Sequence, residues 1–332
     1  MNKTETKNIL VYVELADGAP VKVSAEALAA GRTLATAKGE AVIAVLLGEG
    51  IGEAATAAAT LGADTVIAVD DPAFAAFNLD ATADALGQII EAQKPDAVFI
   101  GGTQDGKDLA PKLAARFKTG CASDVMAAAL GDDGIIFTTP LYGGTILSDV
   151  SIPEARPQIA TIRSGAFKKV EEPTAGTVLS ESITVADDAI RTQITESVKE
   201  IAEAVNLEEA EVIVAGGRGM GSAENFQMVK DLAELLGGVV GATRPAIEDG
   251  WIPRNHQVGQ SGKIVAPKLY IACGISGATQ HLSGITGSDY IVAINKDEDA
   301  PIFEVANVGI VGNALKVLPA FIEEVKKIQA GA

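Results

Sequence analysis

The sequence predicts an α/β protein of two domains, each a mostly parallel sheet with helices on both faces. Short apolar runs alternate with Ala-rich stretches that carry helix start and stop signals. The strand-like runs are apolar throughout, which is typical of parallel strands covered on both faces. The chain has 332 residues, enough for two cores, and a polar, acidic stretch at 186–210 interrupts it. We therefore expect domains at 1–200 and 201–332.

The first domain is predicted as repeated strand–helix units. A strand at 8–15 precedes a helix at 24–39, which has Ser at its start and Gly at its end. The same pattern predicts further strands at 41–48, 65–71 and 97–102. It also predicts one helix that begins after residue 51 and another that ends before the Pro-Asp break at 95–96. The glycines at 101 and 102 end a strand and open a helix, a turn whose amides can face an anion, but it lacks the G-x-x-x-x-G-K-[ST] pattern of a nucleoside-triphosphate site. Residues 134–152 and 156–167 are extended in pattern and predict further strands.

The second domain begins with a strand at 211–215, a Gly-rich turn and a helix that ends at Gly237–Gly238. Apolar runs predict four more strands, within 239–247, 263–277, 289–297 and 302–312. A terminal helix is predicted at 315–329. Right-handed crossovers are expected between these parallel strands. Residues 186–210 are interpreted as the connection between the domains.

Composition excludes several classes of function. The net charge of −18, with no basic run, argues against binding to nucleic acid or to an anionic membrane. Two cysteines, Cys121 and Cys273, cannot hold an ordinary iron–sulfur cluster and are expected to be buried, reduced thiols. The first residues lack an apolar signal segment, and no apolar run is long enough to span a membrane. The expected compartment is the cytoplasm.

The turn GGRGMGS at 216–222 is a candidate diphosphate cradle because it joins a strand to a helix. Its glycines at 217, 219 and 221 depart from G-x-G-x-x-G, and the nearest acidic residue, Glu234, lies inside the predicted helix. Arg218 adds a permanent cation, which suits an anionic ligand. From the pattern alone, a functional and a structural turn are both open.

Two further segments collect polar groups at predicted strand ends. Residues 243–265 form a long irregular segment, typical of a binding loop, in which Trp251 is expected to pack in a core and His256 to be structural. Residues 274–290, GISGATQHLSGITGSDY, follow a strand and contain His281. Such a donor-rich, carboxylate-poor set argues against a paired-carboxylate hydrolase, a metal site and a G-x-S-x-G hydrolase. It favours a phosphate-bearing, anionic cofactor.

Three segments of the second domain resemble the FAD-binding half of electron-transfer flavoprotein α subunits. They are GGRGMGSAENF, VGQSGKIVAPKLYIACGISGATQHLSGI and IVAINKDEDAPIFEVANVGIVGNALKVLP, and GGTQDGKDLAPKLAARF extends the resemblance to the first domain. The resemblance implies a Rossmann-like FAD-binding domain at 201–332 and a domain at 1–200 that pairs with a β subunit. It also implies electron transfer between a dehydrogenase, such as an acyl-CoA dehydrogenase, or NADH and a downstream acceptor, with no catalytic residue of the chain's own.

The resemblance also implies roles for individual residues. Arg218 and Thr243 would contact the diphosphate region, Arg244 would pack on the isoalloxazine, and Ser261 would lie near flavin N5. His281 would lie at flavin O2 and Asn295 at the adenosine end. Ser261 and Asn313 replace Thr and Asp of many relatives, which leaves the adenine contact least defined. The implied cofactor-binding residues are Arg218, Thr243, Arg244, Val258, Gly259, Gln260, Ser261, Ser276, Gly277, Ala278, Thr279, Gln280, His281, Asn295 and Asn313.

Two questions of function stay open from the sequence. Some family members bifurcate the electrons of NADH with a second FAD on the β subunit, and these members use ferredoxin or flavodoxin as a partner. Other members hold AMP on the β subunit instead. The alternative class is an NAD-dependent transferase or a redox-silent dinucleotide-binding module, which would purify without yellow colour. Within the flavin interpretation, His281 and Arg244 are expected to stabilise negative charge near N1 and O2, with the pKa of His281 shifted upward. A hinge for rotation of the FAD domain is expected at 186–210.

Overall fold

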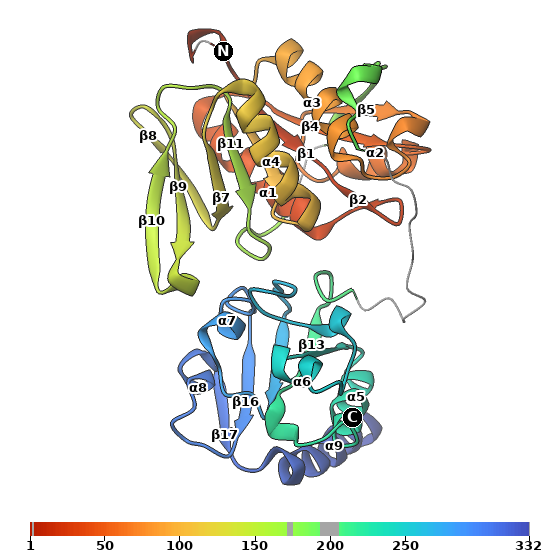
Figure 1. Ribbon diagram of the computed structural model, residues 1–332, viewed down its shortest axis with the longest axis vertical. Helices are drawn as coiled ribbons and strands as arrows, with labels where there is room; N and C mark the ends of the chain where they lie inside the picture. Colours follow the sequence, from red (N-terminus) through yellow and green to blue (C-terminus); the bar gives the residue numbers. More distant parts are fainter. Residues whose placement is uncertain (2, 171–174, 193–205, 332) are drawn as a thin grey trace. The chain divides into compact units, whose positions relative to one another are not determined.

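The structure is a computed structural model that describes residues 1, 3–170, 175–192 and 206–331. The chain divides into two compact units, residues 1–198 and 199–332, each an α/β sandwich (Figure 1). Both units contain a parallel sheet with helices on both faces, so the predicted fold class is confirmed. The predicted domain border at residue 200 and the middle of the predicted hinge, 193–205, lie outside the described residues.

Unit 1 is built on a seven-stranded parallel sheet of order β12-β5-β4-β1-β6-β11-β7. The strands are β1 Ile9–Tyr12, β4 Val42–Gly48, β5 Thr65–Asp70, β6 Ala97–Gly101, β7 Cys121–Val125, β11 Gln158–Ile162 and β12 Thr177–Ser180. The central strands β1, β4 and β6 are buried along their whole length. This burial explains why these strands read as unbroken apolar runs rather than alternating ones.

Four helices cover the two faces of this sheet: α1 Lys22–Lys38, α2 Gly52–Ala58, α3 Leu79–Gln93 and α4 Gln104–Phe117. Helices α1 and α2 pack in the core of one face, and α3 and α4 pack in the core of the other. Asn78 begins α3 by accepting hydrogen bonds from the amides of Asp80 and Ala81, and left-handed Gly39 ends α1. The remaining short elements of unit 1 are the hairpin β2 Leu15–Ala16 and β3 Ala19–Pro20, and 3₁₀ turns at Lys3–Glu5, Pro72–Phe74, Tyr142–Gly144 and Asp187–Ala189.

The turn that opens α4 is not organised to receive an anion. A Cβ on Gly106 would lie 1.9 Å from the carbonyl oxygen of Gly101, so the glycine is required for helix–strand packing. Thr103 Oγ1 accepts from the Gly106 amide at 2.9 Å and itself donates to the carboxylate of Glu14. Because the Glu14 carboxylate already lies at the helix start, it takes the position that an anion would favour in this turn.

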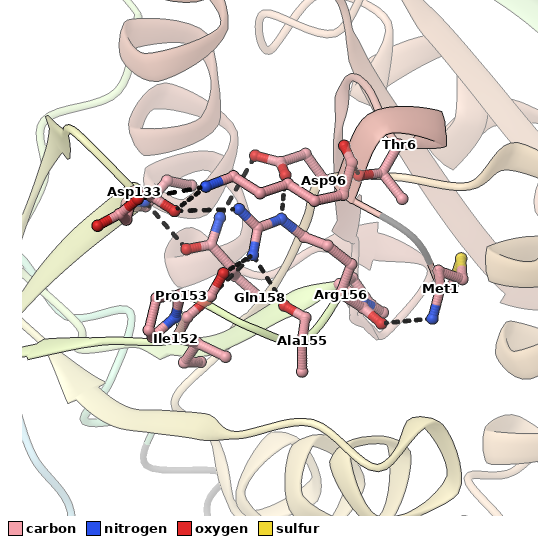
Figure 2. Close-up of polar contacts among 12 residues, drawn as sticks. Met1, Thr6, Asp96, Asp133, Ile152, Pro153, Ala155, Arg156 and Gln158 are labelled. Atoms are coloured by element: carbon pink, nitrogen blue, oxygen red, sulfur yellow. Dashed lines mark hydrogen bonds and ion pairs between the residues drawn. The ribbon is translucent and has the colours of Figure 1, made fainter.

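A separate antiparallel sheet, β8 Ala127–Gly131, β9 Gly134–Leu141 and β10 Ile146–Ser151, extends unit 1. The sequence predicts extended structure at 134–152, which covers β9 and β10, but it predicts neither β8 nor the antiparallel pairing. Arg156, which comes after β10 in the chain, lies at the centre of a buried network of hydrogen bonds and ion pairs (Figure 2). The Arg156 side chain is 1 % exposed, pairs with Asp96, and donates to the carbonyl oxygens of Ile152 at 3.0 Å and Asp133 at 3.3 Å. It therefore ties the start of β6 to the loops that bound the antiparallel sheet.

Unit 2 contains a five-stranded parallel sheet of order β14-β13-β15-β16-β17. Its strands are β13 Val212–Gly216, β14 Val239–Ala242, β15 Leu269–Cys273, β16 Ile291–Asn295 and β17 Val308–Val311. Its helices are α5 Phe226–Leu235, α6 Arg244–Glu248, α7 Thr279–Leu282, α8 Ile302–Val305 and α9 Ala314–Gly331, with 3₁₀ turns at Arg218–Met220 and Arg254–His256. Strand β14 lies on one side of β13 and β15 on the other, so the order reverses there. A ligand is expected beyond the carboxyl ends of strands at such a reversal.

Two predictions about single features are settled by the fold. Cys273, in the central strand β15, is fully buried as expected, but Cys121 is only half-buried, so the prediction is wrong for that residue. Cys121 begins β7, an edge strand that has a neighbour on one side only. None of the helices in the described part of the chain is long and apolar enough to cross a membrane.

Candidate functional site

A cavity of about 750 Å³ lies in unit 2 beyond the carboxyl ends of its strands. Its walls come from the loops after β13, β14, β15, β16 and β17. All the residues predicted to bind a cofactor line this cavity except Thr279, which begins α7. The structure therefore brings the predicted set together, and its role in binding a cofactor stays a prediction.

The sequence analysis missed several wall residues that neighbour predicted ones in the chain. Most are glycine, alanine, proline or isoleucine, whose side chains carry no functional group that could signal a site. Gln257, Lys296 and Asp297 are exceptions, because their polar side chains lie beside a predicted loop and a strand end and could have been included. Gly217 and Gly219 belong to the turn already considered as a diphosphate cradle. The remaining wall residues outside the predicted set are Pro245, Gln257, Gly274, Ile275, Lys296, Asp297 and Ala314.

The Gly-rich turn after β13 is a packing turn. The amide of Gly217 donates to the carbonyl oxygen of Cys273 at 2.9 Å, and that of Gly219 donates to Gly274 at 2.9 Å. A Cβ on Gly219 would lie 2.6 Å from the Gly274 carbonyl oxygen, so only glycine permits this approach. The amides of Gly217 and Gly219 are therefore used for packing against the segment after β15, which supports the structural alternative for these two glycines, and a role of the turn in holding a diphosphate stays a prediction. Arg218 is exposed and forms no ion pair within the described residues.

The segment after β15 presents open backbone donors to the cavity. Ser276, Gly277 and Ala278 all line it, and their amides donate no hydrogen bond within the described chain. Gly277 has φ 89°, and a Cβ there would lie 2.3 Å from the amide nitrogen of Ile302. The glycine thus lets the segment lie against α8 while its amides remain available. Such amides suit a phosphate or a carbonyl oxygen of a ligand.

The loop at 257–263 is held against α7. The amide of Gln260 donates to the carbonyl oxygen of Gln280 at 2.7 Å, and Gly259, with φ 134°, passes close to the same oxygen. Gln257 is buried, and its Nε2 donates to Ser261 Oγ at 2.9 Å. Because Ser261 Oγ accepts this bond, its hydroxyl hydrogen is left for a ligand acceptor.

The rest of the 243–265 segment is more ordered than expected, since it contains α6 and a 3₁₀ turn. Trp251 packs in the core of unit 2, edge to face on Phe226 with ring centroids 6.0 Å apart. His256 places Nδ1 2.7 Å from the carbonyl oxygen of Val240. Both residues therefore have the structural roles predicted for them.

His281 is a buried, neutral imidazole in this structure. Its Nε2 lies 3.0 Å from the Tyr270 hydroxyl, and its Nδ1 lies 3.1 Å from the carbonyl oxygen of Val258. Burial lowers the pKa of His281 to about 4, against a smaller opposing effect of the Val258 carbonyl. The upward shift is expected from a negatively charged flavin and stays a prediction; in the chain by itself the pKa is low, because no carboxylate of the described residues pairs with the buried ring.

The cavity wall is positively charged although the chain is strongly acidic. Arg218, Arg244 and Lys296 line it with a single carboxylate, that of Asp297. The Arg244 side chain is 66 % exposed, and its Nε donates to Glu248 Oε1 at 2.7 Å. This local excess of cations suits an anionic ligand.

The two predicted asparagines organise their own loops. Asn295 Nδ2 donates to the carbonyl oxygen of Ile275 at 2.8 Å, and its Oδ1 accepts from the amide of Asp297 at 3.0 Å. Asn313 Oδ1 accepts from the amide of Leu315 at 3.0 Å and begins the long helix α9. Both side chains are thus positioned at one end of the cavity, with part of their bonding capacity already used.

Comparison with known proteins identifies the class to which this fold and cavity belong. The family model described as the electron transfer flavoprotein domain matches residues 9–188, and the one described as the electron transfer flavoprotein FAD-binding domain matches residues 206–286. The chain therefore belongs to the electron-transfer flavoproteins.

Its relatives specify the subunit. The chain is 44% identical over 333 residues to the electron transfer flavoprotein subunit alpha of Megasphaera elsdenii, covering 98% of both chains. It is 44% identical over 323 residues to that of Bacillus subtilis, covering 97% of this chain and 98% of the relative. It is 42% identical over 326 residues to that of Thermoanaerobacterium thermosaccharolyticum, covering 97% and 99%. The chain is a member of the α-subunit family.

Proposed function

We propose that this chain binds one FAD in the cavity of unit 2 and, paired with a β subunit, carries electrons between a dehydrogenase and a downstream acceptor. The observation that carries the proposal is the cavity wall itself. It combines open amides at 276–278 with three cations against one carboxylate, at the strand-order reversal of a domain that matches an FAD-binding family. The volume of about 750 Å³ lies within the roughly 300–1,000 Å³ usual for ligand pockets.

The residues of the wall fit the parts of FAD. Arg218, exposed and without an ion pair in the described residues, would neutralise the diphosphate, together with the amides of Ser276 and Gly277. Thr243 starts α6 without using its side chain as a cap, so its hydroxyl is left for the ligand. Ser261, with its oxygen engaged by Gln257, would donate its hydroxyl hydrogen to a ring nitrogen. When bound, FAD supplies the isoalloxazine that takes up and releases electrons.

Unit 1 offers a surface for the β subunit. Large apolar side chains that are at least one-third exposed gather on the antiparallel sheet and its turns: Leu130, Leu141, Tyr142, Ile146, Leu147 and Val150. Tyr142 is 79 % exposed at the β9–β10 turn. Exposed apolar groups gathered in this way mark interaction surfaces. This surface supports the proposal that unit 1 pairs with the β subunit.

FAD binding is tested on the chain co-expressed with its β subunit. We expect a yellow complex with flavin absorbance, and FAD released on denaturation. Replacing Arg218 by Gln removes a charge-assisted contact of about 1.5–3 kcal/mol, so the Kd for FAD should rise about 10- to 100-fold. Lys268→Gln, at an exposed ion pair with Glu211 outside the cavity, is the matched control. A colourless complex that takes up no added FAD would refute the proposal and favour the redox-silent module.

The electron donor and the mode of transfer form the finer part of the proposal. A relative from Anaerotignum propionicum, named acryloyl-CoA reductase electron transfer subunit beta, is 35% identical over 352 residues. This name supports a flavoenzyme that acts on a CoA thioester, such as an acyl-CoA dehydrogenase, as the partner. Counting flavins per heterodimer separates the modes. Two flavins and NADH-dependent reduction of ferredoxin or flavodoxin indicate bifurcation, whereas one flavin with AMP on the β subunit indicates a simple carrier.

A further inference from the structure

A buried tyrosine–histidine pair adjoins the cavity: His281 lines it, and Tyr270 lies behind His281 without lining the cavity itself. Tyr270, in the central strand β15, is 0 % exposed, and His281, in α7, is 6 % exposed. The two rings are tilted by 56° with centroids 6.1 Å apart, and the hydroxyl of Tyr270 lies 3.0 Å from Nε2 of His281. Tyr270 otherwise belongs to an apolar core cluster.

The hydrogen-bond partners of His281 determine its tautomer. The Val258 carbonyl oxygen can only accept, so the Nδ1 atom 3.1 Å from it carries a hydrogen. In the neutral ring Nε2 then holds a lone pair, and the Tyr270 hydroxyl can donate to it. A doubly protonated ring would need the hydroxyl to accept instead and to place its own hydrogen in an apolar core. The pair therefore favours the neutral imidazole.

The same imidazole joins two walls of the cavity. Its Nδ1 bond to Val258 connects α7 to the start of the 257–263 loop. Beside it, the amide of Gln260 donates to Gln280 at 2.7 Å, and Gly284 lies so close that a Cβ there would be 2.5 Å from the Cα of Gly259. A rotation of the His281 ring would break the first of these ties and loosen the loop that carries Ser261.

We propose that Tyr270 is a positioning residue: its hydroxyl donates to Nε2 of His281 and so holds the ring in the orientation in which Nδ1–H bonds to Val258 and ties the 257–263 loop to α7. In the chain without a ligand both imidazole nitrogens are hydrogen-bonded within the protein, and His281 lines the cavity beside the cations Arg218, Arg244 and Lys296. The identity of the ligand rests on the proposed function, whereas the tautomer is a property of the chain itself.

The groups around the pair are consistent with this role. From β15, only Tyr270 and Cys273 are titratable, and burial raises the pKa of both. From the facing loop, Lys263 is paired with Glu208 at 2.8 Å. From α7, Thr279 and Gln280 are uncharged. Within the described residues no ion pair reaches His281, so nothing favours its charged form.

The test uses the full chain with its β subunit, with only the α chain labelled with ¹⁵N-histidine. The chain has two histidines, so the spectrum of a His256→Gln variant identifies the His281 signals. In the wild type stripped of FAD we expect one protonated and one unprotonated ring nitrogen, unchanged between pH 8 and pH 5. In Tyr270→Phe the Val258 carbonyl oxygen still holds the hydrogen on Nδ1, but Nε2 loses its only donor, so we expect the Nε2 signal to move toward that of an imidazole nitrogen that accepts no hydrogen bond. Tyr290→Phe, at an exposed tyrosine of the same unit, should behave as the wild type.

Two outcomes would overturn the proposal. One is a wild-type His281 that is doubly protonated at pH 7, which needs no variant to detect. The other is a folded Tyr270→Phe whose histidine signals match the wild type. Deuterium exchange at the amide of Gln260 adds a readout of the tie between the loop and α7 and should be faster in Tyr270→Phe than in Tyr290→Phe. FAD should also bind about two- to ten-fold more weakly to Tyr270→Phe. If no form binds FAD, the proposed function fails while the histidine spectra still decide the role of Tyr270.

Discussion

The buried ion pair at the centre of Figure 2 makes a quantitative prediction about the stability of unit 1. Replacing Asp96 by Asn keeps the size of the side chain but removes the anion that faces Arg156. The Arg156 side chain is 1 % exposed and that of Asp96 is 8 % exposed, so water cannot replace the lost partner. Lys38 also loses Asp96 but retains Glu40 at 2.9 Å.

The magnitude follows from leaving one buried charge unpaired. Removing one partner of a buried pair costs about 3–5 kcal/mol. Part of the Arg156 charge stays compensated by the carbonyl oxygens of Ile152 and Ala155, at 3.0 and 2.9 Å, so we expect the lower end, about 3 kcal/mol. At about 2 kcal/mol per M for a domain of this size, the urea midpoint should fall by about 1.5 M.

The assay uses the separation of the two units in the sequence. The only tryptophan, Trp251, lies in unit 2, so its fluorescence reports unit 2, whereas far-UV circular dichroism reports both units. Asp96→Asn should move the dichroism transition and leave the fluorescence transition in place. Glu5→Gln, at the exposed 3.6 Å pair with Lys94, should move neither. If Asp96→Asn behaved like Glu5→Gln, Arg156 would not depend on Asp96 and the argument from burial would fail.

Three further predictions concern unit 2 and the partner surface. Burial lowers the folded-state pKa of His281 to about 4, so as the pH falls the unfolded chain binds the proton before the folded chain does. The free energy of unfolding should therefore fall by about 3 kcal/mol between pH 6.5 and pH 4. Urea titration followed by Trp251 fluorescence measures this loss. Gly219→Ala places a Cβ 2.6 Å from a facing carbonyl oxygen and should cost about 1–3 kcal/mol, whereas Gly331→Ala, with open space around it, should be neutral. Tyr142→Ser should leave the stability of the chain unchanged and weaken binding of the β subunit about 10-fold or more, measured by calorimetry.

Each of these has a clear contrary result. An equal acid loss in wild type and His281→Gln would assign the pH dependence to carboxylates instead. A Gly219→Ala chain as stable as Gly331→Ala would mean that the turn moves away from Gly274 without cost. Undiminished affinity of Tyr142→Ser for the β subunit would place the partner elsewhere on unit 1.

The comparison of sequence and structure separates local from long-range information. Strands such as 42–48 and helices such as 104–117 are predictable because burial on both faces and capping residues leave a pattern in neighbouring positions. The antiparallel pairing of β8, β9 and β10 is not, because pairing partners and register depend on contacts far apart in the chain. Arg156 gave no signal either, since a lone arginine beside proline predicts no buried partner.

The candidate site divides in the same way. The sequence alone predicts which segments meet at the site. Polar and small residues follow several predicted strands, the family's motifs fall on the same segments, and parallel strands bring their carboxyl ends to one edge of the sheet. Only the tertiary structure decides what each group has left to offer. It shows that the amides of Gly217 and Gly219 donate to the carbonyl oxygens of Cys273 and Gly274, and that both ring nitrogens of His281 are hydrogen-bonded within the chain. Hydrogen-bond capacity and the cost of burying a charge depend on the three-dimensional surroundings of a residue, which its neighbours in sequence do not specify.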